Sequence, residues 1–470
     1  MATTTAGPLT GPRGGADTDY RAELSGWVAA QAGGAIVGWR RVAAGGRRIG
    51  IAVEVRPLSG PDLELYVAVE TTRRAAEDQT SRLALEAEIF TRLRAADVPV
   101  PDVIAIHPSQ DAMLMTRQPG SAGYAAISDP DRSAAVARDF MACLARIHHV
   151  DPAEGGFASL GPVLSAREHL GRFLESWASS YRRGSPEPDP VLEFGLRWLR
   201  SARPSVDRPA RLVQGDTGPG NFLFEGESVT AVLDWELAHF GDPQEDLGWL
   251  SMRAAQEPMP DFPDLLAFYA ERAGTSLDLP AIRYYRVLAE WTVAVIGHLK
   301  PRSGLGDTER GNALVYEQLH RRLLVEAIAD AVGATGTLPG ITLPEAPPSP
   351  RTWLYDMALD QIRESVVPRL TDPLGERRAK GVARTVRVLR ELDRYHHELD
   401  ALLADARIKA LGHVGEPGDL AAAIADGRVD DQAALRYAWA DASATTAVCR
   451  PAMGRLASTH LAPLTPGERA

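Results

Sequence analysis

Two acidic residues, each within three positions of the end of a short apolar run, are the residues of this chain best suited to carry chemistry. Asp216 follows the run 212–213, Asp234 follows the run 231–233, and Asn221 stands five positions after Asp216. A carboxylate can orient an attacking hydroxyl group, and carboxylate and amide oxygens are ligands that Mg²⁺ prefers. The pattern therefore favours phosphoryl transfer from a nucleoside triphosphate to a hydroxyl.

The segment between Asp216 and Asn221 contains Gly218, Pro219 and Gly220. Such a segment lets the chain leave a strand and curl back, so that the Asp and Asn side chains can face one cavity. A polar turn in which Asp216 and Asn221 satisfy their own backbone is the competing interpretation.

Composition limits the classes of function. The 470 residues exceed one ordinary domain, and 45% hydrophobic with 24% charged residues allow a large core. The net charge of −11 argues against a nucleic-acid binder, which needs a basic face. The two cysteines, Cys143 and Cys449, exclude a disulfide framework and a four-cysteine zinc site.

Targeting signals are not evident. Residues 1–19 are rich in Thr, Gly and Pro without an apolar segment, so we expect a flexible tail rather than a signal peptide. The most apolar window, 291–299, is far shorter than the roughly 20 residues that span a bilayer. We expect a cytoplasmic protein without membrane association.

The organisation along the chain predicts a strand-rich part followed by a helical part. Segments 49–56 and 63–70 alternate apolar with other residues, which indicates a β-hairpin. We expect a flexible tail at 1–20, a strand-rich lobe at 21–120, and a mainly helical lobe at 121–340 whose β-hairpin holds both acids. A Pro-rich linker at 341–350 and a helical domain at 351–470 complete the division.

Gln214-Gly215-Asp216, Asn221 and Asp234-Trp235-Glu236 together resemble the motifs of the aminoglycoside phosphotransferase/choline kinase-like family. These proteins are relatives of the protein kinases, and their usual motif is His-Gly-Asp, four further residues and Asn. The resemblance covers roughly residues 20–330, and its nearest branch is the kinase domains associated with acyl-CoA dehydrogenases. It implies a two-lobed, protein-kinase-like α+β fold, here with an all-α C-terminal domain that resembles an uncharacterised helical domain found beside such kinases.

The resemblance also implies roles for individual residues. Asp216 is expected to be the catalytic base, with ATP as phosphate donor and Mg²⁺ held by Asn221 and Asp234. Ala68 suits a nucleotide base, and Glu86 matches a glutamate on a helix of the small lobe. The implied acceptor is a hydroxyl of a small molecule, with hydroxyacyl-CoA suggested by the branch.

The small lobe departs from this pattern. A kinase-like strand carries a lysine that binds the α- and β-phosphates, whereas the corresponding run here ends in Glu70. The departure would also leave Glu86 without its lysine partner. Three explanations stay open. Arg47 or Arg48, or else Arg73 or Arg74, supplies the charge; the alignment is shifted; or the chain is a pseudokinase that binds a nucleotide or acyl-CoA and regulates a partner enzyme.

Two further assignments are left with alternatives. Acceptor contacts are expected between Phe240 and Lys300, where Tyr284, Tyr285 and Trp291 are either contacts or core residues. The amphipathic helices of 351–470 either dock a protein partner or a second copy, or only stabilise the chain.

Overall fold

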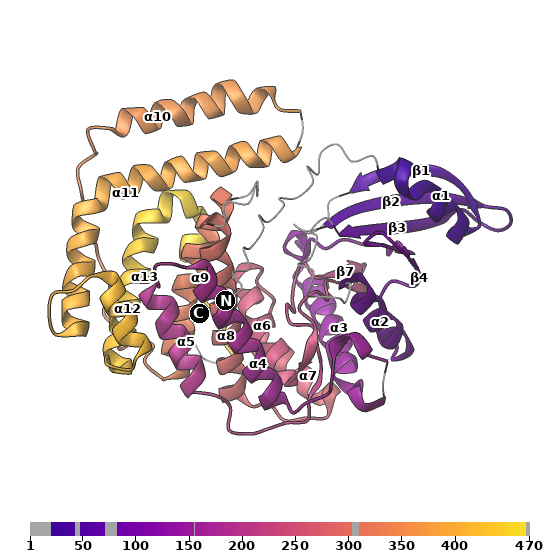
Figure 1. Ribbon diagram of the computed structural model, residues 1–470, viewed down its shortest axis with the longest axis horizontal. Helices are drawn as coiled ribbons and strands as arrows, with labels where there is room; N and C mark the ends of the chain where they lie inside the picture. The colour runs from indigo at the N-terminus through magenta and orange to yellow at the C-terminus, as the bar shows by residue number, and fades with distance from the viewer. Residues whose placement is uncertain are drawn as a thin grey trace, which may run out of the picture. The chain divides into compact units, whose positions relative to one another are not determined.

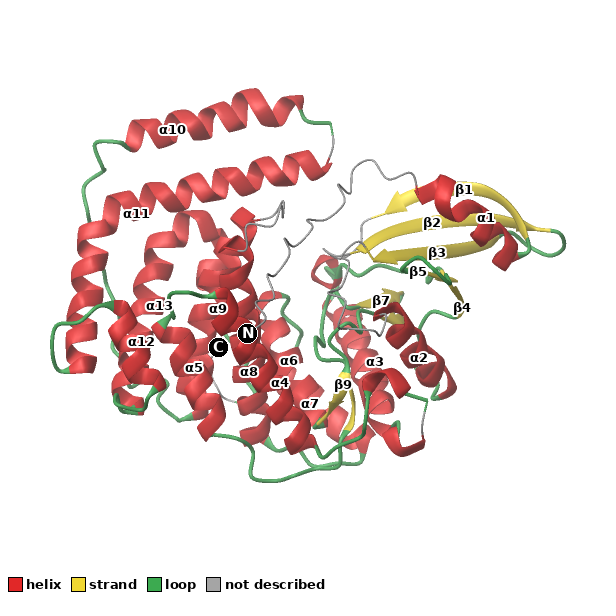
Figure 2. Ribbon diagram, viewed as in Figure 1, coloured by secondary structure: helices red, strands yellow, loops and turns green. Residues whose placement is uncertain are grey.

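The computed structural model describes residues 20–42, 48–70, 82–154, 156–302, 310–371 and 373–466 (Figures 1 and 2). The chain forms two compact units. The first comprises residues 1–165, 209–243 and 267–275, and the second comprises 166–208, 244–266 and 276–470. A sheet with helices in the first unit and helices throughout the second confirm the predicted α+β class with a helical C-terminal region.

The first unit carries the described strands. Its elements are α1 (Tyr20–Ala32), β1 (Gly34–Val42), β2 (Arg48–Pro57), β3 (Leu63–Glu70), α2 (Arg82–Ala95), β4 (Val103–Ile106), β5 (Ala112–Thr116), α3 (Pro130–His149), β6 (Arg211–Val213), β7 (Phe222–Glu225), β8 (Ser228–Val232) and β9 (His239–Gly241). Helix α7 (Phe262–Ala273) begins in the second unit and ends in the first.

An antiparallel sheet with strand order β1-β2-β3-β5-β4 forms the small lobe. The predicted hairpin of β2 and β3 is confirmed, and its register places Arg48 opposite Glu70. Helix α1, which the sequence analysis did not predict, packs Leu24 and Val28 into the apolar cluster of this sheet. Because alternate side chains of a strand share one face, this cluster takes the apolar residues of β2 and β3.

The strands that precede the two acids are not paired with each other. Strand β6, before Asp216, pairs with β9, whereas β8, before Asp234, pairs with β7. The expectation that one hairpin holds both acids is therefore wrong. Two separate strand pairs hold them, because the complete hairpin of β7 and β8 lies between the acids in sequence.

The second unit is helical. Its helices are α4 (Ala166–Gly184), α5 (Pro190–Ser201), α6 (Pro243–Gln256), α8 (Leu279–Arg302), α9 (Arg310–Ala331), α10 (Thr352–Gln361), α11 (Pro373–Leu411), α12 (Pro417–Ala425) and α13 (Asp431–Met453).

One hydrophobic cluster joins the C-terminal helices to the earlier ones. It contains Phe194 of α5, Trp291 of α8, Leu324 of α9 and Ala434 of α13, all almost fully buried. The Pro-rich stretch 341–350 lies within the second unit and does not coincide with a boundary between the compact units.

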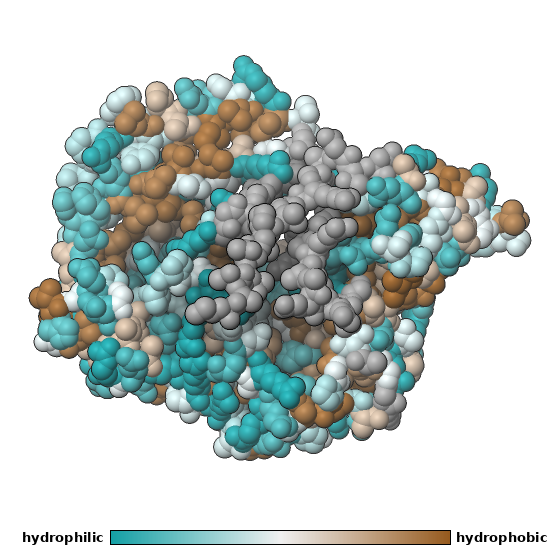
Figure 3. Space-filling model, viewed as in Figure 1, coloured by the Kyte–Doolittle hydropathy of each residue, from teal (hydrophilic) through white to brown (hydrophobic). Residues whose placement is uncertain are grey.

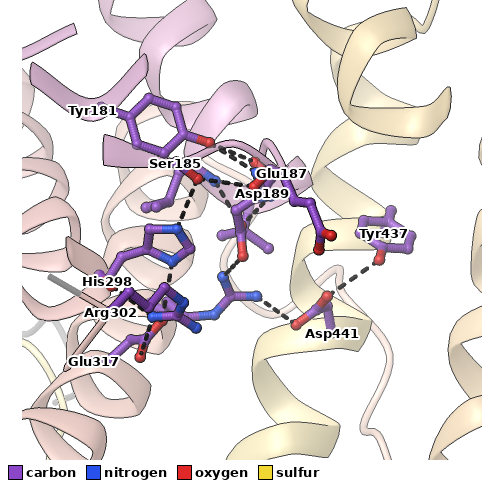
Figure 4. A network of polar contacts seen from close by, with 12 residues as sticks. Tyr181, Ser185, Glu187, Asp189, His298, Arg302, Glu317, Tyr437 and Asp441 are labelled. Carbon is purple, nitrogen blue, oxygen red and sulfur yellow. Dashed lines mark hydrogen bonds and ion pairs between the residues drawn. The ribbon is translucent and has the colours of Figure 1, made fainter. Parts of the chain in front are cut away.

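A buried polar network crosses the same helices (Figure 4). Arg321 of α9 pairs with Asp189, the N-cap of α5, and donates a hydrogen bond to Asp441 of α13 at 2.8 Å. Tyr437 donates to the same Asp441 at 3.2 Å. Since the buried carboxylate of Asp441 and the partly buried carboxylate of Asp189 both face Arg321, the network ties α13 to the helical core.

Helices α10 and α11 leave apolar side chains exposed, visible as brown surface in Figure 3. On α10 these include Trp353, Leu354 and Met357, and on α11 Val382 and Leu389. The prediction that the C-terminal helices dock a partner stays a prediction.

Candidate active site

The loop after β6 presents Asp216. Gly215 adopts φ of 81°, and a Cβ atom there would lie 2.5 Å from the carbonyl oxygen of Leu237, so the position requires glycine. Beyond the loop, the Nδ2 atom of Asn221 donates to the Asp216 carbonyl oxygen at 2.7 Å and to its Oδ2 at 2.9 Å. The two residues singled out from the sequence are therefore in direct contact, and the amide oxygen of Asn221 is left for another partner.

Asp234 lies where the segment after β8 meets the loop after β6. The Leu233 backbone N–H donates to the Asn221 carbonyl oxygen at 2.8 Å, and Gln214 Nε2 donates to the Leu233 carbonyl oxygen at 2.6 Å. Gln214, which stands where the resembled motif has histidine, thus braces the segment that carries Asp234. Asp234 has φ of 60°, a left-handed conformation that is uncommon for residues other than glycine and concentrated at functional sites.

Negative charge is concentrated around Asp234. Burial, together with the carboxylates of Glu236, Asp216 and Glu86, raises the pKa of Asp234 to about 6, against the opposing effect of Arg48. A carboxylate in such surroundings costs free energy unless a cation joins it. The cluster is therefore suited to bind a cation.

The small lobe brings Arg48 and Glu86 together. Arg48 Nη1 donates to Glu86 Oε2 at 2.7 Å, and Arg48 Nε lies 3.5 Å from Glu70 Oε2. The Trp235 backbone N–H in turn points at Glu86 Oε1, at 3.5 Å. Glu86 therefore has a cationic partner after all. This partner is Arg48 of β2, one of the residues that the sequence analysis offered as the source of the missing charge.

The other predicted nucleotide contacts are less defined. Ala68 is buried in β3, opposite Gly50 of β2 and Met113 of β5. Arg47, together with Arg73 and Arg74, lies outside the described residues.

A magnesium site built from these residues needs ligands from elsewhere. In the part of the chain that the structure describes, no group of three or more His, Cys, Asp and Glu side chains forms a metal site. Mg²⁺ commonly uses one or two carboxylates and completes its shell with substrate phosphates and water. Asn221 and Asp234, with the excess negative charge around Asp234, fit that incomplete donor set.

The aromatic residues considered for acceptor binding are core residues. Tyr284, Tyr285 and Trp291 are buried in the hydrophobic cluster of the second unit. The Tyr284 hydroxyl donates to the Leu199 carbonyl oxygen and Trp291 Nε1 donates to that of Leu192, each at 2.9 Å. Their polar atoms are thus used within the fold.

Glu70 is a site residue whose role the sequence analysis missed. The sequence analysis considered it only as the acid that stands where a lysine is expected. In the structure it forms an ion pair with Arg48. The hairpin register contained the signal: pairing Val55 with Leu63 and counting outward puts residue 48 opposite residue 70.

Among the described residues, no helix is long and apolar enough to cross a membrane.

Comparisons with known proteins match the part of the chain that contains these residues. The family model described as "Phosphotransferase enzyme family" matches residues 67–291, which contain Asp216, Asn221 and Asp234. Acyl-CoA dehydrogenase family member 10 of Mus musculus is 31% identical over 214 residues, 43% of this chain and 19% of that protein. Family member 11 of Rattus norvegicus is 27% identical over 185 residues, 36% of this chain and 23% of that protein.

The chain thus matches only about a fifth of the length of these curated relatives. Among solved structures, one from Ralstonia eutropha, described as a candidate aminoglycoside phosphotransferase, has a TM-score of 0.52 at 19% identity. That match covers 67% of this chain and 98% of the other, and it shows that the fold is shared.

Proposed function

We propose, from the match of residues 67–291 to the model of the phosphotransferase enzyme family, that this chain transfers the γ-phosphate of ATP to a hydroxyl group of a small molecule. The observation that carries the proposal is the contact between Asp216 and Asn221, with the Asp234 segment hydrogen-bonded to the same loop. Phosphoryl transfer requires mainly positioning and charge stabilisation, and this arrangement supplies both.

Asp216 is the proposed catalytic base. Its carboxylate orients the acceptor hydroxyl and accepts the proton as the oxygen attacks phosphorus. The hydrogen bonds from Asn221 fix the backbone and side chain of Asp216 before the acceptor binds. This pre-organisation is what an in-line transfer requires of its base.

Asn221 and Asp234 are the proposed ligands of Mg²⁺, which would neutralise charge on the phosphates when bound. The left-handed backbone of Asp234 and the hydrogen bond from Gln214 to Leu233 hold this ligand in place. Arg48, Ala68 and Glu86 are the proposed residues of the nucleotide side, with Arg47 as a further candidate.

The acceptor class is proposed from the relatives. Their printed names describe acyl-CoA dehydrogenase family members, which favours a hydroxyacyl-CoA over other hydroxylated small molecules. A panel containing a hydroxyacyl-CoA, its free hydroxy acid, an amino alcohol and an amino sugar tests this choice. Transfer only to the amino sugar would exclude the acyl-CoA class.

Glu70 supports one alternative, a non-catalytic pseudokinase that binds a nucleotide or acyl-CoA and regulates a partner enzyme. A carboxylate where a lysine is expected opposes phosphate binding unless a cation offsets it. Thermal shift with ATP and Mg²⁺, for the wild type beside Asp234→Asn, tests whether the chain binds ATP. The enzyme should be stabilised by MgATP and the variant much less; no shift in either protein would contradict ATP use. Phosphate transfer to the acceptor panel, with and without Asp216→Asn, then separates an enzyme from a binder.

A further inference from the structure

The cation of the candidate active site comes from β2, while a glutamate occupies the β3 position where the family has a lysine. We propose that Arg48 is the side chain that binds the nucleotide phosphates, and that Glu70 is a positioning residue that orients Arg48. This inference rests on the proposed function, because it assigns the phosphate contact within that same site.

One hydrogen bond and one ion pair of the Arg48 guanidinium leave its third nitrogen available. Its Nη1 donates to Glu86 at 2.7 Å, and its Nε lies 3.5 Å from Glu70. Its Nη2 is buried and has no hydrogen-bond partner among the described residues. A guanidinium is a planar fork that matches phosphate oxygens, so a group held on two sides by carboxylates presents its third side to an anion.

The surroundings keep Arg48 charged and close to the proposed metal ligands. Burial opposes the charge, yet the carboxylates of Glu86, Glu70 and Asp234 outweigh burial and raise the pKa of Arg48 above its usual value. Glu86, which accepts from Arg48, also lies 3.5 Å from the backbone N of Trp235, the residue after Asp234, and this contact links Arg48 to the metal side of the site. A polyphosphate bound there would meet the guanidinium and the metal together.

The identity of residue 70 follows from the position of Arg48. The two residues are directly opposite in the antiparallel pair of β2 and β3. Opposite charges at such positions attract, whereas like charges repel. A lysine at position 70 would face Arg48, so a cation on β2 favours an acid on β3, and the two departures from the family pattern compensate each other.

Arg82 is less suited to the phosphate role. It pairs with Glu236 at 3.5 Å, and both side chains are about one-third exposed, at 31% and 35%. Arg47, Arg73 and Arg74 lie outside the described residues, so the experiment includes each of them as a competitor.

The experiment measures the binding of ADP and of adenosine, both with Mg²⁺, by isothermal titration calorimetry on the full chain. The variants are Arg48→Gln, Glu70→Gln and the transposed pair Arg48→Gln/Glu70→Lys. The competitors are tested by Arg47→Gln, Arg73→Gln and Arg74→Gln. The matched control is Arg56→Gln, because Arg56 lies on the same strand and pairs with Asp62 at the exposed end of the hairpin.

Arg48→Gln should weaken ADP binding by about 10- to 100-fold and leave adenosine binding unchanged, because the lost donors serve only phosphates. Arg56→Gln should match the wild type, and the transposed pair should regain much of the ADP preference. Glu70→Gln should weaken the binding of ADP but not that of adenosine, whereas the loss of a merely structural residue would weaken the binding of both ligands equally. If Arg48→Gln does not fold, Arg48→Lys takes its place, because lysine keeps the positive charge without the planar guanidinium. Its affinity for ADP should be about tenfold lower than that of the wild type.

The assignment of Arg48 would be overturned if Arg48→Gln still preferred ADP over adenosine. It would also be overturned if this preference were lost in Arg47→Gln, Arg73→Gln or Arg74→Gln instead. Tighter ADP binding by Glu70→Gln would overturn the positioning role of Glu70. A wild type that binds neither ATP nor ADP would overturn the proposed function itself, which is a separate and distinguishable result.

Discussion

Asn221 holds Asp216 through a single nitrogen atom that donates both to its main-chain carbonyl, at 2.7 Å, and to its carboxylate, at 2.9 Å. The residue proposed to bind the metal therefore also fixes the residue proposed as the base. Changes at position 221 should affect both functions together.

Asn221→Asp tests this coupling. The substitution replaces two donated hydrogen bonds by a carboxylate facing the oxygens of Asp216, which repel it. We expect kcat to fall by at least about 100-fold, a loss typical of a misplaced catalytic base. Steady-state assays of phosphate transfer measure it, with Glu227→Gln as control, since Glu227 is exposed in the turn between β7 and β8. Wild-type kcat in Asn221→Asp would refute the coupling.

Local sequence patterns predicted the elements near the site but not their partners. The alternation in 63–70 and 49–56 identified the hairpin, because a strand with one buried face has a period of two. The pairing of β6 with β9 was missed, because each strand has only three residues and carries no periodic signal.

The contact between Arg48 and Glu86 could not be predicted from spacing alone. It joins residues 38 positions apart, across a strand and a helix, and the family pattern directed attention to β3 instead. By contrast, the contact between Asp216 and Asn221 joins residues only five positions apart, so a local motif could indicate it. Local contacts were thus predictable from the sequence, and long-range electrostatic pairing was not.

Asp234 is expected to reduce the stability of the metal-free protein. Its buried carboxylate faces Glu236, Asp216 and Glu86, and Asn tolerates the same left-handed backbone. Asp234→Asn should therefore raise the free energy of unfolding without Mg²⁺ by on the order of 1–2 kcal/mol, while abolishing stabilisation by MgATP.

Thermal melts with and without MgATP check both parts of this prediction. Asp234→Ala is the comparison, because alanine removes the charge but does not favour φ of 60°. Equal destabilisation by Asn and Ala would show that Asp234 carries no electrostatic cost.

Arg321 is expected to be essential for the second unit. It faces Asp189 and Asp441, so Arg321→Met would leave one buried and one partly buried carboxylate without their cation. Breaking such a pair costs about 3–5 kcal/mol. Urea unfolding followed by tryptophan fluorescence measures the loss, and the exposed Arg363→Met in the same unit should show no measurable change.

The pair of Arg321 and Asp189 also predicts that the stability of the protein depends on pH. Burial opposes ionisation of Asp189, but Arg321 and the capping hydrogen bond from Leu192 outweigh it and lower the pKa of Asp189 below its usual 3.8. Its contribution to stability is complete above about pH 4 and is lost as the pH falls through the lowered pKa. The difference in the free energy of unfolding between the wild type and Arg321→Met should therefore narrow below pH 4. A difference that stays constant with pH would contradict the lowered pKa of Asp189.

The most direct test of the proposed function is the transfer of labelled γ-phosphate from ATP to the acceptor panel, with Mg²⁺, by wild type, Asp216→Asn and Glu227→Gln. We expect label on a hydroxyl-bearing acceptor with the wild type and with Glu227→Gln, and a rate at least about 100-fold lower with Asp216→Asn. Transfer that is undiminished in Asp216→Asn, or a wild type that binds MgATP but labels no acceptor, would contradict the proposed function.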